Sequence, residues 1–227
     1  MLDNVSQIYV TTLAQLPPVP SIVPILKTNV STTTDETTST FTGIDISVPH
    51  PKRIVIVSCH HGVAAAATAT CNGIDAYHRT QNTAHEFSMF AFQVPNGTLA
   101  TITISATGSV RKWIAVYIAY PKNHTPLDSG TGTANTTTNA TVANVKVQSG
   151  GFLLACGGQN ATLGAFSTTW GGPDAVIEDG DAQYESASSF TYTRIGSISV
   201  SSDANTVTLA ETVSGTKRLV VTTWGPP

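Results

Sequence analysis

Charged side chains are scarce in this sequence of 227 residues. Asp, Glu, Lys and Arg make up 11% of the chain, whereas a soluble domain typically has roughly 25%. The eleven Lys and Arg residues are scattered and the formal net charge is −3, so the chain lacks the basic stripe with which nucleic-acid-binding proteins neutralise phosphates. We therefore expect no nucleic-acid partner.

Long apolar runs are also missing. No stretch approaches the ~20 apolar residues that a membrane-spanning helix needs. The first ten residues, MLDNVSQIYV, have neither the basic region nor the continuous apolar core of a signal peptide. These absences predict no membrane partner and no signal peptide.

Cysteine is too rare for a disulfide framework. The three cysteines are Cys59, Cys71 and Cys156, and an odd count without a secretory signal is typical of free thiols. We expect all three to be buried, and a bridge between Cys59 and Cys71 stays open if their strands are neighbours.

Motifs of common enzymes are absent as well. The sequence has no G-x-S-x-G elbow, P-loop, H-E-x-x-H or paired C-x-x-C. His60 and His61 follow Cys59, but adjacent residues of a strand point to opposite faces, so both cannot bind one transition-metal ion without a bend in the strand. Nothing selects two carboxylates for glycoside hydrolysis. We predict no enzymatic activity, no cofactor and no transition-metal site.

Thr, Ser, Asn and Gly supply the polarity, and apolar residues alternate with polar ones in several short segments. Ile102 and Ile104 alternate with threonines, as do Val207 and Leu209. This period of two indicates strands with one face in a core and one in water. Turn sequences recur every 8–12 residues or so, which is typical of an antiparallel β-sandwich or jelly roll.

The sequence repeats itself. RIVIVSCHHG recurs as GFLLACGGQN, with Cys59 aligned to Cys156, and CNGIDA recurs as WGGPDA. TITISA recurs as TVTLAE, and IAVYIAYP recurs as LVVTTWGP. Four blocks in the same order predict an internal duplication.

The duplication predicts about six short strands in each copy. We assign a first β repeat to residues 41–121, a linker or crossover to 122–139 and a second β repeat to 140–227. The favoured arrangement is one jelly-roll-like antiparallel sandwich formed by both repeats together. The alternative is two separate domains joined by the linker.

Residues 1–40 differ in character and are interpreted as an N-terminal docking arm. Four prolines in LPPVPSIVPIL exclude a regular helix or a central strand and favour an extended apolar ribbon. The arm could pack on its own domain or on a neighbouring subunit, and docking on a neighbour is the favoured interpretation. The predicted docking residues are Leu13, Leu16, Pro17, Pro18, Val19, Pro20, Ile22, Val23, Pro24, Ile25 and Leu26.

Two groups of polar and aromatic residues are candidate ligand sites. Hard oxygen ligands for Ca²⁺ could come from an acidic segment, although a solvated acidic loop is the favoured interpretation. That segment contains Asp174, Glu178, Asp179 and Asp181. Loops that could contact a glycan or a receptor carry Tyr77, His78, Trp170 and Tyr184.

The repeated blocks resemble those of Thr/Ser/Gly/Ala-rich β-sandwich proteins of tailed bacteriophages and gene-transfer-agent-like particles. The resemblance covers residues 41–227 and consists of a C/W-N/G-G block (CNGIDA, WGGPDA), a later T-I/V-T-I/L strand (TITIS, TVTLA) and a closing strand (IAVYIAYP, VVTTWGP).

This resemblance implies a structural virion protein made in the cytoplasm of a bacterial host, such as a head fibre, a capsid decoration protein, or a neck or tail accessory protein. It implies other virion proteins as partners, and we also expect a homo-oligomer. It carries over no catalytic residue. The alternative is a carbohydrate- or receptor-binding module that recognises a host surface glycan through its loops.

Overall fold

The computed structural model describes residues 23–62, 66–82, 86–134, 139–159, 166–184, 188–211 and 215–227. Within these ranges every regular element is a β-strand and every strand pair is antiparallel. The predicted all-β, antiparallel class is confirmed. This part of the chain holds no helix long and apolar enough to cross a membrane.

The first half of the chain forms two sheets. The first inner sheet has the strand order β1 (Ile25–Ser31), β9 (Trp113–Ala119), β3 (Ile54–His60), β7 (Phe87–Gln93) and β6 (His78–Gln81). The first outer sheet has the order β2 (Glu36–Asp45), β8 (Leu99–Val110), β4 (Thr68–Cys71) and β5 (Ile74–Asp75).

The second half repeats this order. The second inner sheet has the order β10 (Asp128–Ala134), β17 (Lys217–Trp224), β12 (Phe152–Gln159), β15 (Ser188–Ile195) and β14 (Ile177–Tyr184). The second outer sheet has the order β11 (Ala140–Val147), β16 (Ser202–Glu211) and β13 (Phe166–Trp170). The matching strand orders are those expected of the predicted duplication.

The strand pairs of the first half are nested in the manner of a jelly roll. With β6 set aside, the first strand pairs with the last (β1 with β9), the second with the last but one (β2 with β8), the third with β7, and β4 with β5. The second half keeps the first three of these pairs, β10 with β17, β11 with β16 and β12 with β15. Each half is therefore a double-sheet jelly roll.

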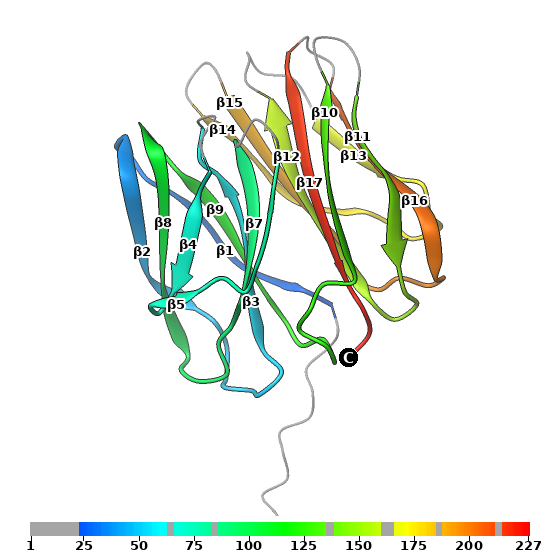
Figure 1. Ribbon diagram of the computed structural model, residues 1–227, viewed down its shortest axis with the longest axis horizontal. Helices are drawn as coiled ribbons and strands as arrows, with labels where there is room; N and C mark the ends of the chain where they lie inside the picture. Colours follow the sequence, from blue (N-terminus) through cyan, green and yellow to red (C-terminus); the bar gives the residue numbers. More distant parts are fainter. Residues whose placement is uncertain are drawn as a thin grey trace, which may run out of the picture.

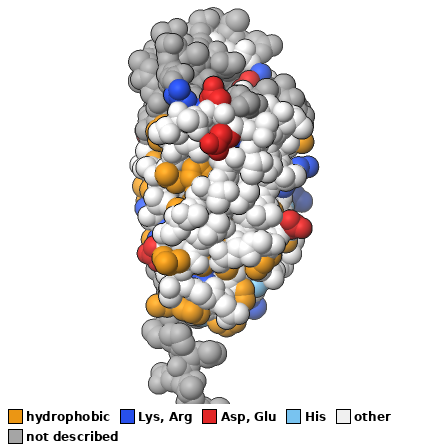
Figure 2. Space-filling model, turned by 90° about the vertical axis from the view of Figure 1, so that its left-hand side faces the viewer, with side chains coloured by type: hydrophobic (Ala, Val, Ile, Leu, Met, Phe, Trp, Pro, Cys, Tyr) orange, Lys and Arg blue, Asp and Glu red, His pale blue; other side chains and the backbone are white. Residues whose placement is uncertain are grey.

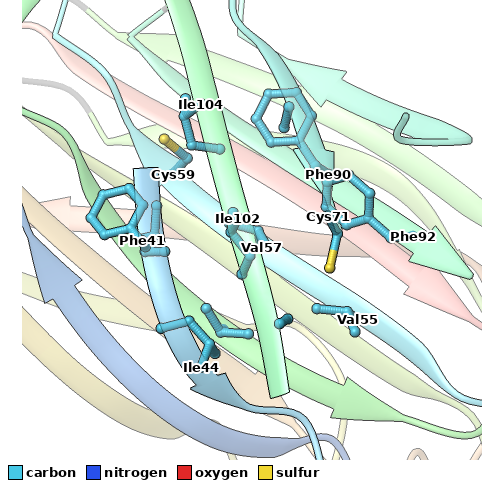
Figure 3. Close-up of a cluster of buried hydrophobic side chains, with 14 of the residues drawn as sticks. Phe41, Ile44, Val55, Val57, Cys59, Cys71, Phe90, Phe92, Ile102 and Ile104 are labelled. Carbon is cyan, nitrogen blue, oxygen red and sulfur yellow. The ribbon is translucent and has the colours of Figure 1, made fainter. Parts of the chain in front are cut away.

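The four sheets stack as four layers, outer–inner–inner–outer (Figure 1). A first core fills the space between the first outer and inner sheets, and Figure 3 shows Phe41, Val57 and Phe90 among its buried side chains. A third core lies within the second half. Between them, a middle core joins the two inner sheets.

The middle core corrects the favoured arrangement of one combined sandwich. Each repeat closes its own two-sheet sandwich, and the outward faces of the two inner sheets then pack on each other. Phe87 of β7 and Phe190 of β15 meet there with ring centroids 6.0 Å apart, and both are buried. The halves are therefore two sandwiches that share a buried interface.

Strand β3 explains why the first inner sheet is apolar on both of its faces. The run Ile54–Val57 has aliphatic residues on both faces of the strand, and all four side chains are fully buried. Val55 and Val57 belong to the first core, whereas Ile54 and Ile56 belong to the middle core. An inner strand covered on both faces is what a continuous apolar run predicts.

The predicted domain boundaries differ from those of the structure. Residues 25–31 and 36–45 form β1 and β2, although both lie wholly or partly in the arm predicted for residues 1–40. Residues 128–134 form β10 inside the predicted linker 122–139. Strands β1 and β10 occupy equivalent edges of the two inner sheets, so each repeat begins one strand earlier than the sequence indicated.

The pairing of Cys59 with Cys156 differs by one residue from the equivalence in the structure, whereas the two ten-residue blocks, aligned from their first residues, already place Ile54 over Phe152. Ile54 lies opposite Ala119, and Phe152 lies opposite Trp224, while Ala119 and Trp224 match in the aligned closing strands. Ile54 is therefore equivalent to Phe152.

This shift separates the two cysteines that the sequence alignment had paired. Cys59 points into the first core, whereas Cys156 points into the middle core. A shift of one residue reverses the face of every side chain on a strand, so Cys156 corresponds to Ser58 instead.

His60 makes the middle core sensitive to acid. Its ring centroid lies 4.9 Å from that of Phe87, and burial lowers the pKa of His60 from 6.5 to about 4. The unfolded chain takes up this proton near pH 6.5 and the folded protein does not. His60 therefore disfavours folding increasingly as the pH falls from 6.5 to 4, by up to about 3 kcal/mol.

We expect the free energy of unfolding of the wild type to fall more steeply across this range than that of His60→Phe, which keeps an aromatic ring but cannot titrate. Urea unfolding at a series of pH values measures both curves. Parallel curves would contradict the role of His60.

Candidate functional site

Exposed large hydrophobic side chains gather at one end of the molecule. This end, called the apolar end below, consists of the loops 46–53, 94–98, 120–127, 148–151, 171–176, 196–201 and 225–227 with the adjoining turn and strand ends. Every exposed large hydrophobic residue of the described chain lies there: Ile25, Val48, Ile74, Tyr77, Leu99, Leu127, Ile177 and Val200. Figure 2 shows hydrophobic side chains gathered toward the lower part of the face of the first half.

Proline follows the same distribution. Every proline among the described residues lies at the apolar end, in the loops defined above or just before β1. Proline and exposed large hydrophobic side chains of the described chain therefore occur together at this end.

Arg53 fixes the loops of the apolar end in the first half. This side chain is fully buried. Its Nε donates to Val94 O at 2.7 Å, and its two terminal nitrogens donate to five further carbonyls. These belong to Ile46, Ser47, Val48, Asn96 and Gly97. One guanidinium thus joins loop 46–53 to loop 94–98 and holds Val48 in its exposed position.

The predicted arm joins the body at this end. Of the predicted docking residues, those from Leu13 to Ile22 lie outside the described residues. Ile25 and Leu26 pair with β9 as part of the inner sheet. The Pro24 carbonyl accepts a hydrogen bond from Arg194, and Val23 lies close to Gly196 of the second half. Residues 23–26 are therefore built into the interface between the halves.

A cleft opens at the side of the first half, between the free edges of its two sheets. It has a volume of about 320 Å³ and is lined by Thr68, Ala69, Asp75, Ala76, Arg79 and Phe90. Small alanines leave the edge of the first core uncovered, so buried Phe90 forms the floor. Arg79 Nη1 donates to Ala67 O at 2.9 Å, which fixes the guanidinium, while Asp75 carries the opposite charge.

The predicted ligand residues of the first half lie beside this cleft but do not line it. The Tyr77 hydroxyl donates to His124 O at 2.7 Å, and the Trp224 indole donates to the same carbonyl at 3.1 Å. His78 Nε2 lies 2.8 Å from Thr80 Oγ1, and burial lowers the pKa of His78. Both residues make contacts that support the fold.

The predicted ligand residues of the second half are not brought together with those of the first. Trp170 is half-buried against the third core and lies over Gly172, where an added methyl would come within 2.1 Å of the indole nitrogen. Tyr184 is in β14, but its side chain lies outside the described part of the chain.

The acidic segment is partly engaged in structural contacts. The carboxylate of Asp174 accepts the Ser199 amide at 3.1 Å. Glu178 begins an irregularity in the pairing of β14 with β15, and the Asp181 side chain lies outside the described part of the chain. Among the described residues no group of three or more His, Cys, Asp or Glu is placed to hold a metal ion.

Asp179 sits at the irregularity in β14 and faces the interface of the two halves. Its carboxylate accepts the Tyr117 hydroxyl at 3.0 Å and lies 3.2 Å from Arg194 Nε. Burial raises the pKa of Asp179, and the nearby Arg194 opposes that rise. This network joins β9 of the first half to β14 and β15 of the second.

The cysteines and neighbouring histidines lie in apolar surroundings. All three cysteines are free and buried, and burial raises the pKa of Cys71 to about 11 and that of Cys156 to about 12. His60 packs on phenylalanines, whereas His61 Nε2 lies 2.8 Å from Ser88 Oγ.

The fold defines the chain as a tandem of two jelly-roll sandwiches with a shared middle core. Comparison with family models, with curated proteins and with solved structures finds no match. The apolar end and the charged cleft were both missed by sequence reasoning, because each is assembled from loops or edges that are distant in the sequence.

Proposed function

We propose that this chain is a non-enzymatic structural component of a bacteriophage virion, attached to its neighbours through its N-terminal arm. A capsid decoration protein, a head fibre, or a neck or tail accessory protein would each fit. The proposal rests on one observation. Residues 23–26, which end the apolar N-terminal segment, join the body at its apolar end.

Physical chemistry supports an assembly role for this end. Val48, Leu99 and Val200 are 57–58% exposed, although large aliphatic side chains gain free energy when they leave water. Exposed apolar residues that cluster, rather than scatter, mark interaction surfaces. The Arg53 contacts hold one part of this surface in place, which lowers the entropy lost on docking.

The fold adds support by analogy only. Double-sheet jelly rolls serve in viral capsid proteins, and they serve equally in lectins and cupins. The fold therefore agrees with the resemblance of the repeated blocks to virion proteins but does not choose between a virion component and a glycan-binding module.

Deletion of residues 1–22 tests the proposal and leaves strands β1 to β17 in place. We expect purified particles assembled with the truncated chain to contain far less of it than particles assembled with the full chain, as measured by quantitative immunoblotting. Thr38→Ser, a change on the exposed face of β2, is the matched control. Normal incorporation of the truncated chain would contradict attachment through the arm.

The cleft of the first half favours the second candidate, a carbohydrate- or receptor-binding module. An anionic group of a ligand could meet Arg79, and a hydroxyl could meet Asp75. Binding on a glycan array that is lost in Arg79→Ala would favour this function. Glu178→Ala, at the equivalent position of the second half, is the control. An array without hits would count against it.

A further inference from the structure

We propose that the apolar end binds a second copy of this chain, with residues 1–22 of each copy lying on the apolar end of the other. The inference rests on the proposed function only in taking residues 1–22 as a docking arm. It adds the identity of the first partner, which is the chain itself.

The apolar end extends across both halves. Val48, Ile74 and Leu99 come from the first half, whereas Ile177 and Val200 come from the second. The two halves have the same strand order and lie side by side, so their corresponding ends face the same way (Figure 1). A partner that covers all of these side chains must therefore span the junction between the halves.

The chemistry of residues 13–24 suits this surface. LAQLPPVPSIVP alternates prolines with aliphatic residues, and proline has no backbone N–H with which to extend a sheet. Such a segment binds by laying its side chains against an apolar surface in an extended, polyproline-like form. The apolar end is made of loops and strand ends rich in proline and aliphatic residues, so it offers side chains rather than a free sheet edge.

The length of the segment permits contact with another molecule. An extended chain of 22 residues spans about 70 Å, at roughly 3.3 Å per residue. A compact domain of this size has a radius of gyration of about 17 Å, equivalent to a sphere about 45 Å across. Because Arg194 fixes the carbonyl of Pro24 at the apolar end, the segment starts where two copies meet if they approach end to end.

The charges at the apolar end allow two copies of the chain to associate through it. Lys27 forms an ion pair with Asp45 at 3.0 Å, and Lys52 and Lys122 lie on the same end as Asp75. Both signs are present, so two copies of the apolar end do not repel each other through charge of one sign. A strongly charged partner, in contrast, would meet no surface of uniformly opposite charge at this end.

The experiment measures the molar mass of the pure full-length protein by light scattering over a concentration series. We expect a dimer, with the dissociation constant raised about tenfold or more by deletion of residues 1–22 and by Leu99→Ser combined with Val200→Ser. These two side chains are 58% and 57% exposed, so the substitutions leave the fold intact, which circular dichroism checks. Thr103→Ser, on the half-buried face of β8, is the control.

A synthetic peptide of residues 1–24 identifies the occupant. It should bind the truncated protein, and Leu99→Ser combined with Val200→Ser should abolish that binding. If the full-length protein is a monomer at every concentration, the inference is wrong. This holds even if the peptide binds, because each arm would then lie on the body of its own chain. A dimer that neither change weakens overturns it as well. Particle incorporation is measured separately, so the proposed function and this inference can fail independently.

Discussion

Replacing Arg53 with methionine is expected to lower the free energy of unfolding by about 3–5 kcal/mol. The guanidinium is fully buried and donates to six backbone carbonyls in two loops. Methionine has a similar length but no donor, so these carbonyls would lose their partner away from water, at a cost of about 1–3 kcal/mol for each one that stays buried.

Urea unfolding of Arg53→Met measures the loss directly. Arg53→Lys keeps the charge but not the fork of donors, so we expect a smaller loss. Lys122→Met removes an exposed positive charge from the same end and serves as the matched control, with an expected change within about 0.5 kcal/mol. If the free energy of unfolding of Arg53→Met equals that of this control, the hydrogen bonds from Arg53 to the six carbonyls do not stabilise the apolar end.

Truncation of Phe190 to alanine is expected to cost about 3–5 kcal/mol and to weaken both halves of the molecule. Phe190 is in the second half, but it stacks on Phe87 of the first half, and its ring centroid lies 5.3 Å from that of Tyr192. The cavity would therefore open between the two inner sheets rather than within one sandwich.

Hydrogen exchange locates the effect of Phe190→Ala. We expect the amides of β3 and β7 to exchange faster in the variant, although the substitution lies in the other half. Val200→Ala, an exposed change in the same half, should leave these amides unaffected. Faster exchange confined to the second half would mean that the sandwiches are stable independently of each other.

The strand class and the duplication could be predicted from the sequence because both depend on short segments, namely alternating apolar residues and repeated blocks. Alternation of Ile102 and Ile104 with threonines requires no knowledge of the partner strand, and both side chains do face the first core. The first strand of each repeat was missed for the same reason. ILKTNVS and DSGTGTA, at β1 and β10, lack a clear apolar alternation because these edge strands depend on pairing with β9 and β17.

The favoured arrangement failed for a different reason. A continuous apolar run such as Ile54–Val57 indicates cover on both faces, but it does not say what provides that cover. The one-residue difference between Cys59 and Cys156 is equally hard to see, since the residue types match and only the strand pairing separates the two faces. The apolar end depends on loops from all parts of the chain, so no local pattern marks it.

Differential scanning calorimetry tests most directly whether the two jelly rolls form one body through the middle core. We expect a single endotherm whose calorimetric and van't Hoff enthalpies agree, because neither sandwich can keep its inner sheet buried after the other unfolds. Two endotherms that shift separately, one with Phe41→Ala in the first core and one with Leu209→Ala in the third, would contradict it.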